Sequence, residues 1–281
     1  MFRNEPKGAE SAMKRETIRK ILFAVAGSVF LFSSAMVTTH QREMRNSAEQ
    51  AQTVAQMVVT PAPPPPVTPP TELPKEESME AVVEEPTETA PIQVDFDTLC
   101  ASNPDVIAWI YCPDTPINYP VVQSSDNDYY LRRLLDGSWN TAGTLFMDYR
   151  NASDLTDWNS IIYGHNLKNS TMFGTLLHYQ EQSYFEAHPK IYLLTPEQDY
   201  AIEVLAGYTT PADSALYSAF VPSEEDQTQW VKNWLASSDF VSGAEPAAEA
   251  RFVTLSTCSY SFDRARYVLI GSLKPLADQQ E

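Results

Sequence analysis

Two short runs near the C-terminal end of the chain are rich in β-branched, aromatic and other apolar residues and have the pattern of β-strands. One face of the first run, residues 251–258, carries Phe252, Thr254, Ser256 and Cys258. Residues 265–273 repeat the β-branched and aromatic pattern after a short polar segment. The two runs predict an antiparallel hairpin in which Cys258 ends one strand and Arg266 begins the next strand beside it.

The same kind of pattern recurs along the chain and predicts a mostly β domain. Further short strands are expected at 106–111, 117–122, 143–148, 159–164, 190–194 and 200–208. Helices are expected at 95–101, 127–135, 170–179 and 223–237. The last begins with Ser223 and three acidic residues, which suits a helix N-terminus because such side chains cap free N–H groups and favour the positive end of the dipole. Many short strands with few helical inserts indicate a β-barrel.

The N-terminal part has a different pattern. Residues 21–39 carry no charged side chain and follow a stretch, 1–20, that is rich in Lys and Arg. As a helix the apolar run spans about 28 Å, close to the hydrocarbon thickness of a bilayer. We therefore expect a retained single-pass membrane anchor with residues 1–20 in the cytoplasm and the chain after residue 40 outside. The alternatives are a cleaved signal peptide, for which residues 33–35 offer small side chains, and a buried core helix.

Residues 40–91 have the composition of an unfolded tether. Ten of the 21 prolines fall between Pro61 and Pro91, together with seven glutamates. Proline removes backbone donors and like charges repel, so this segment is expected to hold the globular part, residues 92–281, away from the membrane. A Pro-rich ligand for a partner domain is the alternative.

Charge and cysteine content exclude several classes of function. Residues 95–281 carry 10 Lys and Arg against 25 Asp and Glu, and no basic patch or base-stacking motif is present, so nucleic acid is not an expected partner. The three cysteines, Cys100, Cys112 and Cys258, lack metal-ligand spacing with the histidines, so no metal or other cofactor is expected. Cys100 and Cys112 either pair outside the cell or are separate buried thiols.

Cys258 and Arg266 form a candidate nucleophilic site, because a fixed positive charge favours thiolate over thiol and stabilises a developing oxyanion. The alternative is a buried apolar cysteine beside a solvated arginine. A base is needed, and His165 is the best candidate because it follows an apolar run and a glycine at a strand end. Arg264 has the same strand parity as Arg266 and is the alternative cation.

At these residues the chain resembles a known family, the class B sortases. The resemblance rests on Tyr163-Gly-His-Asn-Leu-Lys-Asn-Ser-Thr-Met-Phe173, Leu255-Ser-Thr-Cys258 and Ala265-Arg-Tyr-Val268, and on shorter matches at 94–99, 103–110, 119–122, 127–131 and 143–149. It covers roughly residues 92–275. It implies a sortase-like eight-stranded β-barrel with an N-terminal helix and an extra helix between the sixth and seventh strands, where 223–237 lies.

The resemblance also implies a cysteine transpeptidase. Cys258 would be the nucleophile, His165 the acid and base, and Arg266 the group that binds substrate or oxyanion. The donor would be a C-terminal sorting signal of a secreted protein, of an Asn-Pro-x-Thr-like kind, and the acceptor an amine of peptidoglycan precursor or of a pilin. By the same resemblance, the residues expected to line the peptide groove are Asn127, Leu131, Ser256 and Thr257, and the loop expected to cover it contains Tyr217 and Ser218.

A purely structural role is the alternative for two of these residues, since core packing explains Leu131 and strand hydrogen bonding explains Thr257. Two other functions compete with the transpeptidase. A secreted cysteine hydrolase of the wall-remodelling kind would release its product to water. A surface-displayed binding domain would have a Cys258 no more reactive than Cys100 or Cys112.

Overall fold

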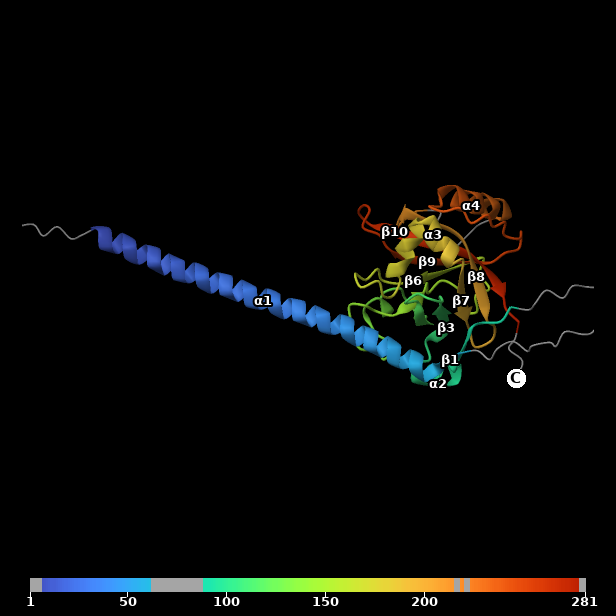
Figure 1. Cartoon of the computed structure of the whole chain (residues 1–281), viewed down its shortest axis with the longest axis horizontal. Helices are drawn as coiled ribbons and strands as arrows, with labels where there is room; N and C mark the ends of the chain where they lie inside the picture. The colour runs from blue at the N-terminus through green and yellow to red at the C-terminus, as the bar shows by residue number, and fades with distance from the viewer. Residues whose placement is uncertain (1–6, 62–87, 215–217, 220–222, 278–281) are drawn as a thin grey trace, which may run out of the picture. The chain divides into compact units, whose positions relative to one another are not determined.

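Eight strands, β3 to β10, hydrogen-bond into a closed barrel in the order β10-β8-β7-β3-β4-β5-β6-β9 (Figure 1). The computed structural model describes residues 7–61, 88–214, 218–219 and 223–277. The barrel strands are β3 (Val106–Tyr111), β4 (Asn118–Val122), β5 (Leu145–Met147), β6 (Asn159–Tyr163), β7 (Lys190–Leu194), β8 (Tyr200–Pro211), β9 (Phe252–Cys258) and β10 (Ala265–Pro275). Every strand expected from the sequence is present, and the predicted eight-stranded barrel is confirmed.

The barrel is filled by side chains that point inward from alternate strand positions. Among them are Ile110, Val121, Leu145, Ile162, Ile202, Leu255 and Leu269, each at most 1% exposed. Most neighbouring strands are antiparallel, but β6 runs parallel to β9, and β4 runs parallel to β5. The parallel pair β6 and β9 brings together segments that are about 90 residues apart in the sequence.

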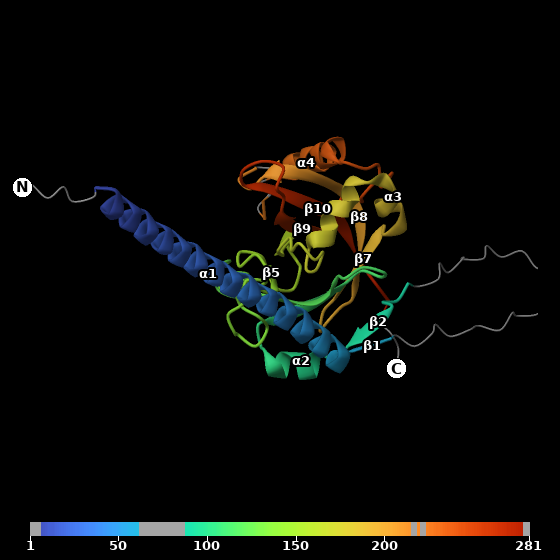
Figure 2. The same ribbon diagram turned by 60° about the vertical axis from the view of Figure 1, so that its left-hand side comes forward.

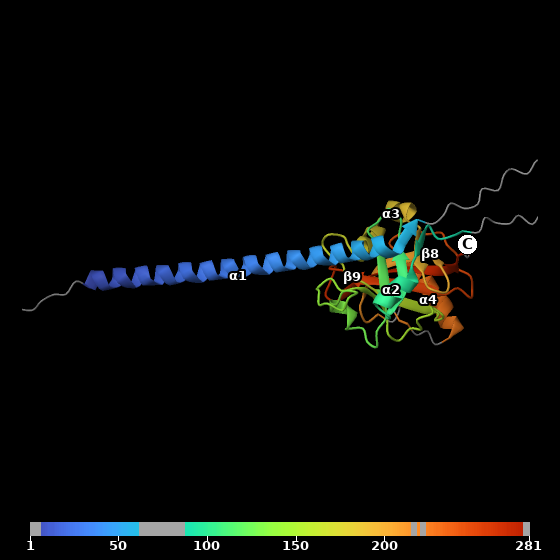
Figure 3. The same cartoon turned by 90° about the horizontal axis from the view of Figure 1, so that it is seen from below.

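Helix α4 (Glu224–Ser237) lies between β8 and β9, the sixth and seventh strands of the barrel, as predicted. Its N-cap is Ser223, whose hydroxyl accepts a hydrogen bond from the N–H of Asp226 at 3.2 Å. The helix packs through the fully buried Trp234, which stacks on Trp158 with ring centroids 5.3 Å apart. In Figure 3, α4 and the short helix α3 (Gln182–Ala187) lie apart, on either side of the strands.

Two of the expected helices are shorter than predicted. In place of 127–135 there is one 3-10 turn, η1 (Tyr130–Arg132), because the Asp126 carboxylate binds the N–H groups of Asp128 and Tyr129 in a turn. In place of 170–179 there is η2 (Gly174–Gln180), also a 3-10 helix. Ser170 and Met172 have φ of 59° and 55°, which an α-helix does not allow. Helix α3 was not predicted.

Helix α1 (Lys7–Val58) spans two compact units of the chain, residues 1–46 and 47–281, which we describe separately. In the first unit the apolar side chains of Phe23, Phe30 and Leu31 are exposed. The helical segment Glu16–Val58 is long and apolar enough to cross a membrane, judged by its length and composition.

In the second unit, residues 47–58 of α1 pack against the barrel domain. Ser47 and Val58 are 8% and 4% exposed, and Ala51 and Val54 are partly buried on the same face. Strand β1 (Val59–Pro61) follows and pairs antiparallel with β2 (Ile92–Val94), next to α2 (Phe96–Ser102) in Figure 2. Residues 47–61, which the composition assigned to an unfolded tether, form helix and strand in the structure, because positions 47, 51, 54 and 58 form a helical apolar stripe. Most of the Pro-rich stretch, 62–87, lies outside the described residues.

Candidate active site

Two parallel strands end at the same edge of the barrel and carry the candidate histidine and cysteine there. Tyr163 at the end of β6 pairs with Ser256 of β9, and the N–H of Gly164 donates to the Ser256 carbonyl at 3.0 Å. His165 is the next residue of the chain. Because parallel strands point the same way, His165 and Cys258 both leave the sheet at this edge.

The hairpin of β9 and β10 brings the candidate cation to the same place. Arg266 is the register partner of Cys258, as predicted. The N–H of Ser259 donates to the Ala265 carbonyl at 3.0 Å. The next pair along the two strands, Cys258 and Arg266, is therefore a non-hydrogen-bonded pair of the antiparallel ladder. In such a pair the two side chains stand closest, on one face of the sheet. Arg264, the alternative cation, lies in the connecting loop with φ of 56° and an exposed side chain.

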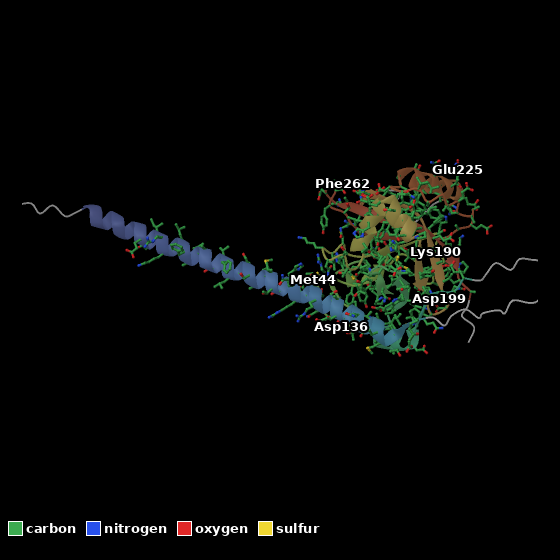
Figure 4. All side chains as sticks on the ribbon, in the orientation of Figure 1. Met44, Asp136, Lys190, Asp199, Glu225 and Phe262 are labelled. Carbon is green, nitrogen blue, oxygen red and sulfur yellow. The ribbon has the colours of Figure 1, made fainter. Side chains whose placement is uncertain are left out.

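The loop between β9 and β10 is on the far side of the barrel from the turn between β7 and β8. Figure 4 labels one residue of each, Phe262 and Asp199. Phe262 therefore marks the end of the barrel that carries the candidate site.

His165 is half-buried, and its Nε2 lies 2.9 Å from the carbonyl oxygen of Leu131. A carbonyl can only accept a hydrogen bond, so Nε2 carries the proton in this arrangement and Nδ1 keeps a lone pair. Burial lowers the pKa of His165 below its usual value, and the charges of Arg132 and Arg266 lower it further, against the opposing effect of the Leu131 carbonyl. The imidazole is thus neutral near pH 7 and able to take up a proton.

Cys258 is a free thiol, partly exposed at the end of β9. Its carbonyl oxygen accepts a hydrogen bond of 2.9 Å from the Asn166 side-chain amide. Cys100 and Cys112 are also free, and burial raises the pKa of both thiols. Those two thiols are therefore poor nucleophiles at neutral pH.

The expected groove residues lie in different surroundings. Asn127 donates to Asp148 at 3.1 Å and accepts from the N–H of Tyr149 at 3.0 Å. Leu131 touches the site through the carbonyl that holds His165. The Ser218 carbonyl accepts a hydrogen bond of 3.0 Å from the side-chain amide of Asn159, the first residue of β6. Tyr217 lies outside the described residues.

Ser256 and Thr257 are both 1% exposed, so neither offers surface to a peptide in this conformation. Ser256 shares the strand face of Cys258, whereas Thr257 shares the face of Val253 and Leu255, which point into the barrel core. Their role in binding a peptide remains a prediction.

A buried carboxylate beside the site was not foreseen from the sequence. Asp148 follows β5, is fully buried, and takes three hydrogen bonds from Arg150: two from the guanidinium, at 2.8 and 2.7 Å, and one from the backbone N–H, at 3.0 Å. The hydroxyl of Tyr163 donates to it at 2.8 Å, and the Asn127 side-chain amide donates at 3.1 Å. Burial by itself raises the pKa of Asp148, but the bonds and charge of Arg150, with the bond from Tyr163, bring it down to about 2. Through Asp148, these hydrogen bonds connect the loop that contains Asn127 to Tyr163 at the end of β6.

Within the described residues no group of three or more His, Cys, Asp or Glu side chains is placed to hold a metal ion.

Comparison with known proteins gives consistent matches. The family model for the Sortase domain matches residues 110–274. Sortase B of Listeria monocytogenes is 34% identical over 173 residues, which are 61% of this chain and 70% of that protein. The structure of a Staphylococcus aureus sortase B-substrate complex matches with a TM-score of 0.62 and 29% identity, covering 65% of this chain and 85% of that chain. A sortase B complexed with triglycine matches with the same score and identity, over 65% and 86%.

The family model covers more than half of the chain, and the closed eight-stranded barrel matches the sortase B structures. The chain belongs to the sortase family, within its sortase B group, and is therefore a cysteine transpeptidase.

Proposed function

We propose that this sortase is anchored in the cell membrane and joins secreted proteins to an amine of the cell surface, with Cys258, His165 and Arg266 as its catalytic residues. The observation that supports these assignments is that β6, β9 and β10 carry the three side chains to one edge of the barrel. A nucleophile, a base and a fixed cation are the groups that acyl transfer through a thioester needs.

In the first step the neutral imidazole of His165 takes the proton of the Cys258 thiol, and the sulfur attacks the scissile carbonyl carbon. The guanidinium of Arg266 donates hydrogen bonds to the oxyanion of the tetrahedral intermediate. The C–N bond then breaks, the imidazolium returns its proton to the leaving amine, and a thioester remains on Cys258.

In the second step an acceptor amine attacks the thioester carbon and His165 removes the proton that this amine must lose. The C–S bond breaks, a new amide forms, and the thiol of Cys258 takes back a proton. The two steps exchange one amide for another, so no cofactor or external energy source is needed.

The substrate classes follow from the relatives. One matched sortase B was solved with its substrate and another with triglycine. By that likeness the donor here is a sorting-signal peptide, of an Asn-Pro-x-Thr-like kind, and the acceptor is an amine of peptidoglycan precursor or of a pilin lysine. Asn127, Leu131, Tyr217, Ser218, Ser256 and Thr257 are the groove residues that this proposal assigns.

The apolar helix supports the membrane anchor. The segment 21–39 contains no charge and lies within the helix that is long and apolar enough to cross a bilayer. Its N-terminal side carries the excess of Lys and Arg that faces the cytoplasm in single-pass proteins, which puts the catalytic domain outside the cell.

The full chain in detergent micelles is the sample for the test, with a fluorogenic peptide that contains Asn-Pro-x-Thr and triglycine as acceptor. We expect amide product only with triglycine, and at least about a 1000-fold loss in Cys258→Ala, His165→Ala and Arg266→Ala. Cys112→Ala is the matched control and should keep activity. A product that is the free acid at any triglycine concentration would indicate a hydrolase instead.

Thiol labelling separates a catalytic domain from an inactive binding domain. Iodoacetamide should modify Cys258 faster than Cys100 or Cys112, since burial raises the pKa of the latter two thiols. Equal rates at the three cysteines would contradict the proposal.

A further inference from the structure

The side chain of Asn166 continues the hydrogen-bond ladder between β6 and β9 beyond the end of β6. The last backbone bond of the ladder runs from the Gly164 N–H to the Ser256 carbonyl, at 3.0 Å. Two residues further on both segments, the Asn166 side-chain amide donates to the Cys258 carbonyl at 2.9 Å. In a regular parallel pair the backbone N–H of residue 166 would make this bond. The amide side chain replaces it.

This replacement lets the backbone leave the sheet at His165 while the loop stays attached to the cysteine strand. The loop is closed at its base, because the His165 carbonyl accepts from the Phe173 N–H at 3.1 Å and Asn166 forms an isolated bridge with Met172. Met172 is held in turn by the Tyr119 hydroxyl, which accepts from its N–H at 3.2 Å. The imidazole is thus placed by a loop whose contact with the Cys258 peptide group runs through the Asn166 amide.

We propose that Asn166 is a positioning residue of the transfer reaction, which sets the placement of the His165 ring relative to the Cys258 sulfur by binding the Cys258 carbonyl. The inference rests on the proposed roles of His165 and Cys258 and extends them. The Asn166 amide binds the Cys258 carbonyl and not the thiol, so its effect passes through the histidine loop.

The hydrogen bond from the Asn166 amide to the Cys258 carbonyl contributes more to the geometry of the site than to the stability of the fold. Asn166 is partly exposed, so water can replace its amide at the carbonyl, and the neighbouring strands keep their ladders without it. Proton transfer between sulfur and imidazole, however, depends steeply on their separation, and a displacement of about 1 Å costs about 100-fold in rate.

Two substitutions and one control test the role in the full chain with the Asn-Pro-x-Thr peptide and triglycine. Asn166→Ala removes the side chain, whereas Asn166→Asp keeps its shape and loses the donor. We expect kcat to fall about 10- to 100-fold in both, with KM for the peptide within about threefold. The control is Asn169→Ala, in the same loop, where the side chain of the exposed Asn169 binds Thr171. It should leave kcat unchanged.

A second measurement reports on the histidine itself, independently of transfer. NMR titration of the chain with labelled histidine follows four rings, and the His165 resonance is the one lost in His165→Ala. Burial lowers the pKa of His165 in the native loop. Release of the loop in Asn166→Ala and Asn166→Asp should raise that pKa towards 6.5, the ordinary value for histidine.

An unchanged kcat in both Asn166 variants would overturn the inference, and so would an equal loss in Asn169→Ala or an unchanged His165 titration. Failure of the proposed function looks different, because His165→Ala would then keep full transfer activity. The titration still decides whether Asn166 holds the loop in that case.

Discussion

The buried Asp148 carboxylate should make a measurable contribution to stability that disappears in acid. Its side chain is fully buried, and Arg150 and Tyr163 bring its pKa from the ordinary 3.8 to about 2. A difference of nearly two pKa units between the folded and unfolded chain corresponds to about 2 kcal/mol. For a domain of this size, about 2 kcal/mol of added stability raises the melting temperature by about 4–8 °C.

The sign follows from the lowered pKa in the folded state. Above pH 4 the carboxylate is ionised whether the chain is folded or not, and the folded chain has the full benefit of the Arg150 pair. As the pH falls towards 2 the unfolded chain takes up the proton first, which removes the benefit. The contribution is thus present at neutral pH and lost between about pH 4 and pH 2.

Asp148→Asn is the perturbation, because the amide keeps the shape and removes the charge. We expect its free energy of unfolding in urea, followed by tryptophan fluorescence, to be about 2 kcal/mol lower than that of the native chain at pH 7. The difference should shrink as the pH falls from 4 to 2. Asp128→Asn, at an exposed position, is the control and should change stability by less than about 0.5 kcal/mol. Equal stability of Asp148→Asn and the native chain at pH 7 would refute the reasoning.

Three further results are expected. Arg132→Ala removes one of the charges that lower the pKa of His165, so the acid limb of kcat/KM against pH should move to higher pH; a shift to lower pH would contradict this electrostatic effect. Val58→Asp places a charge on the buried face of α1 and should lower the melting temperature by several degrees, whereas Met57→Asp, at a position 68% exposed, should not; equal melting temperatures would mean that residues 47–58 do not pack on the barrel. Trp234→Ala should cost about 3–5 kcal/mol in urea unfolding, and a loss below about 1 kcal/mol would show that α4 is not held by this side chain.

Local patterns in the sequence were sufficient for the strands and for one side of the site. Short runs of β-branched, aromatic and other apolar residues are a property of a few neighbouring residues, and they located all eight barrel strands. The hairpin of β9 and β10 joins strands that are adjacent in the chain, so the short turn predicted the pairing of Cys258 with Arg266, and Arg264 was the alternative that the register excludes.

The expected helices show where local patterns are insufficient. Side-chain bonds from Asp126 and left-handed residues at 170 and 172 replaced two helices by 3-10 turns. Composition did not predict the packed helix at residues 47–58. The stripe formed by residues 47, 51, 54 and 58 stabilises a helix only where the barrel wall covers it.

The sequence by itself therefore determined the barrel strands, the apolar N-terminal segment and the identity of the candidate nucleophile, cation and base. Only the tertiary structure decided that His165 and Cys258 leave the barrel at the same edge, that Asn166 binds the cysteine strand, and that Asp148 is buried against Arg150 and Tyr163. The physical reason is that closure of the barrel pairs β6 with β9 across 92 residues of chain, as between Asn166 and Cys258. No short-range pattern records a pairing of that kind, because its free energy comes from the packed core as a whole.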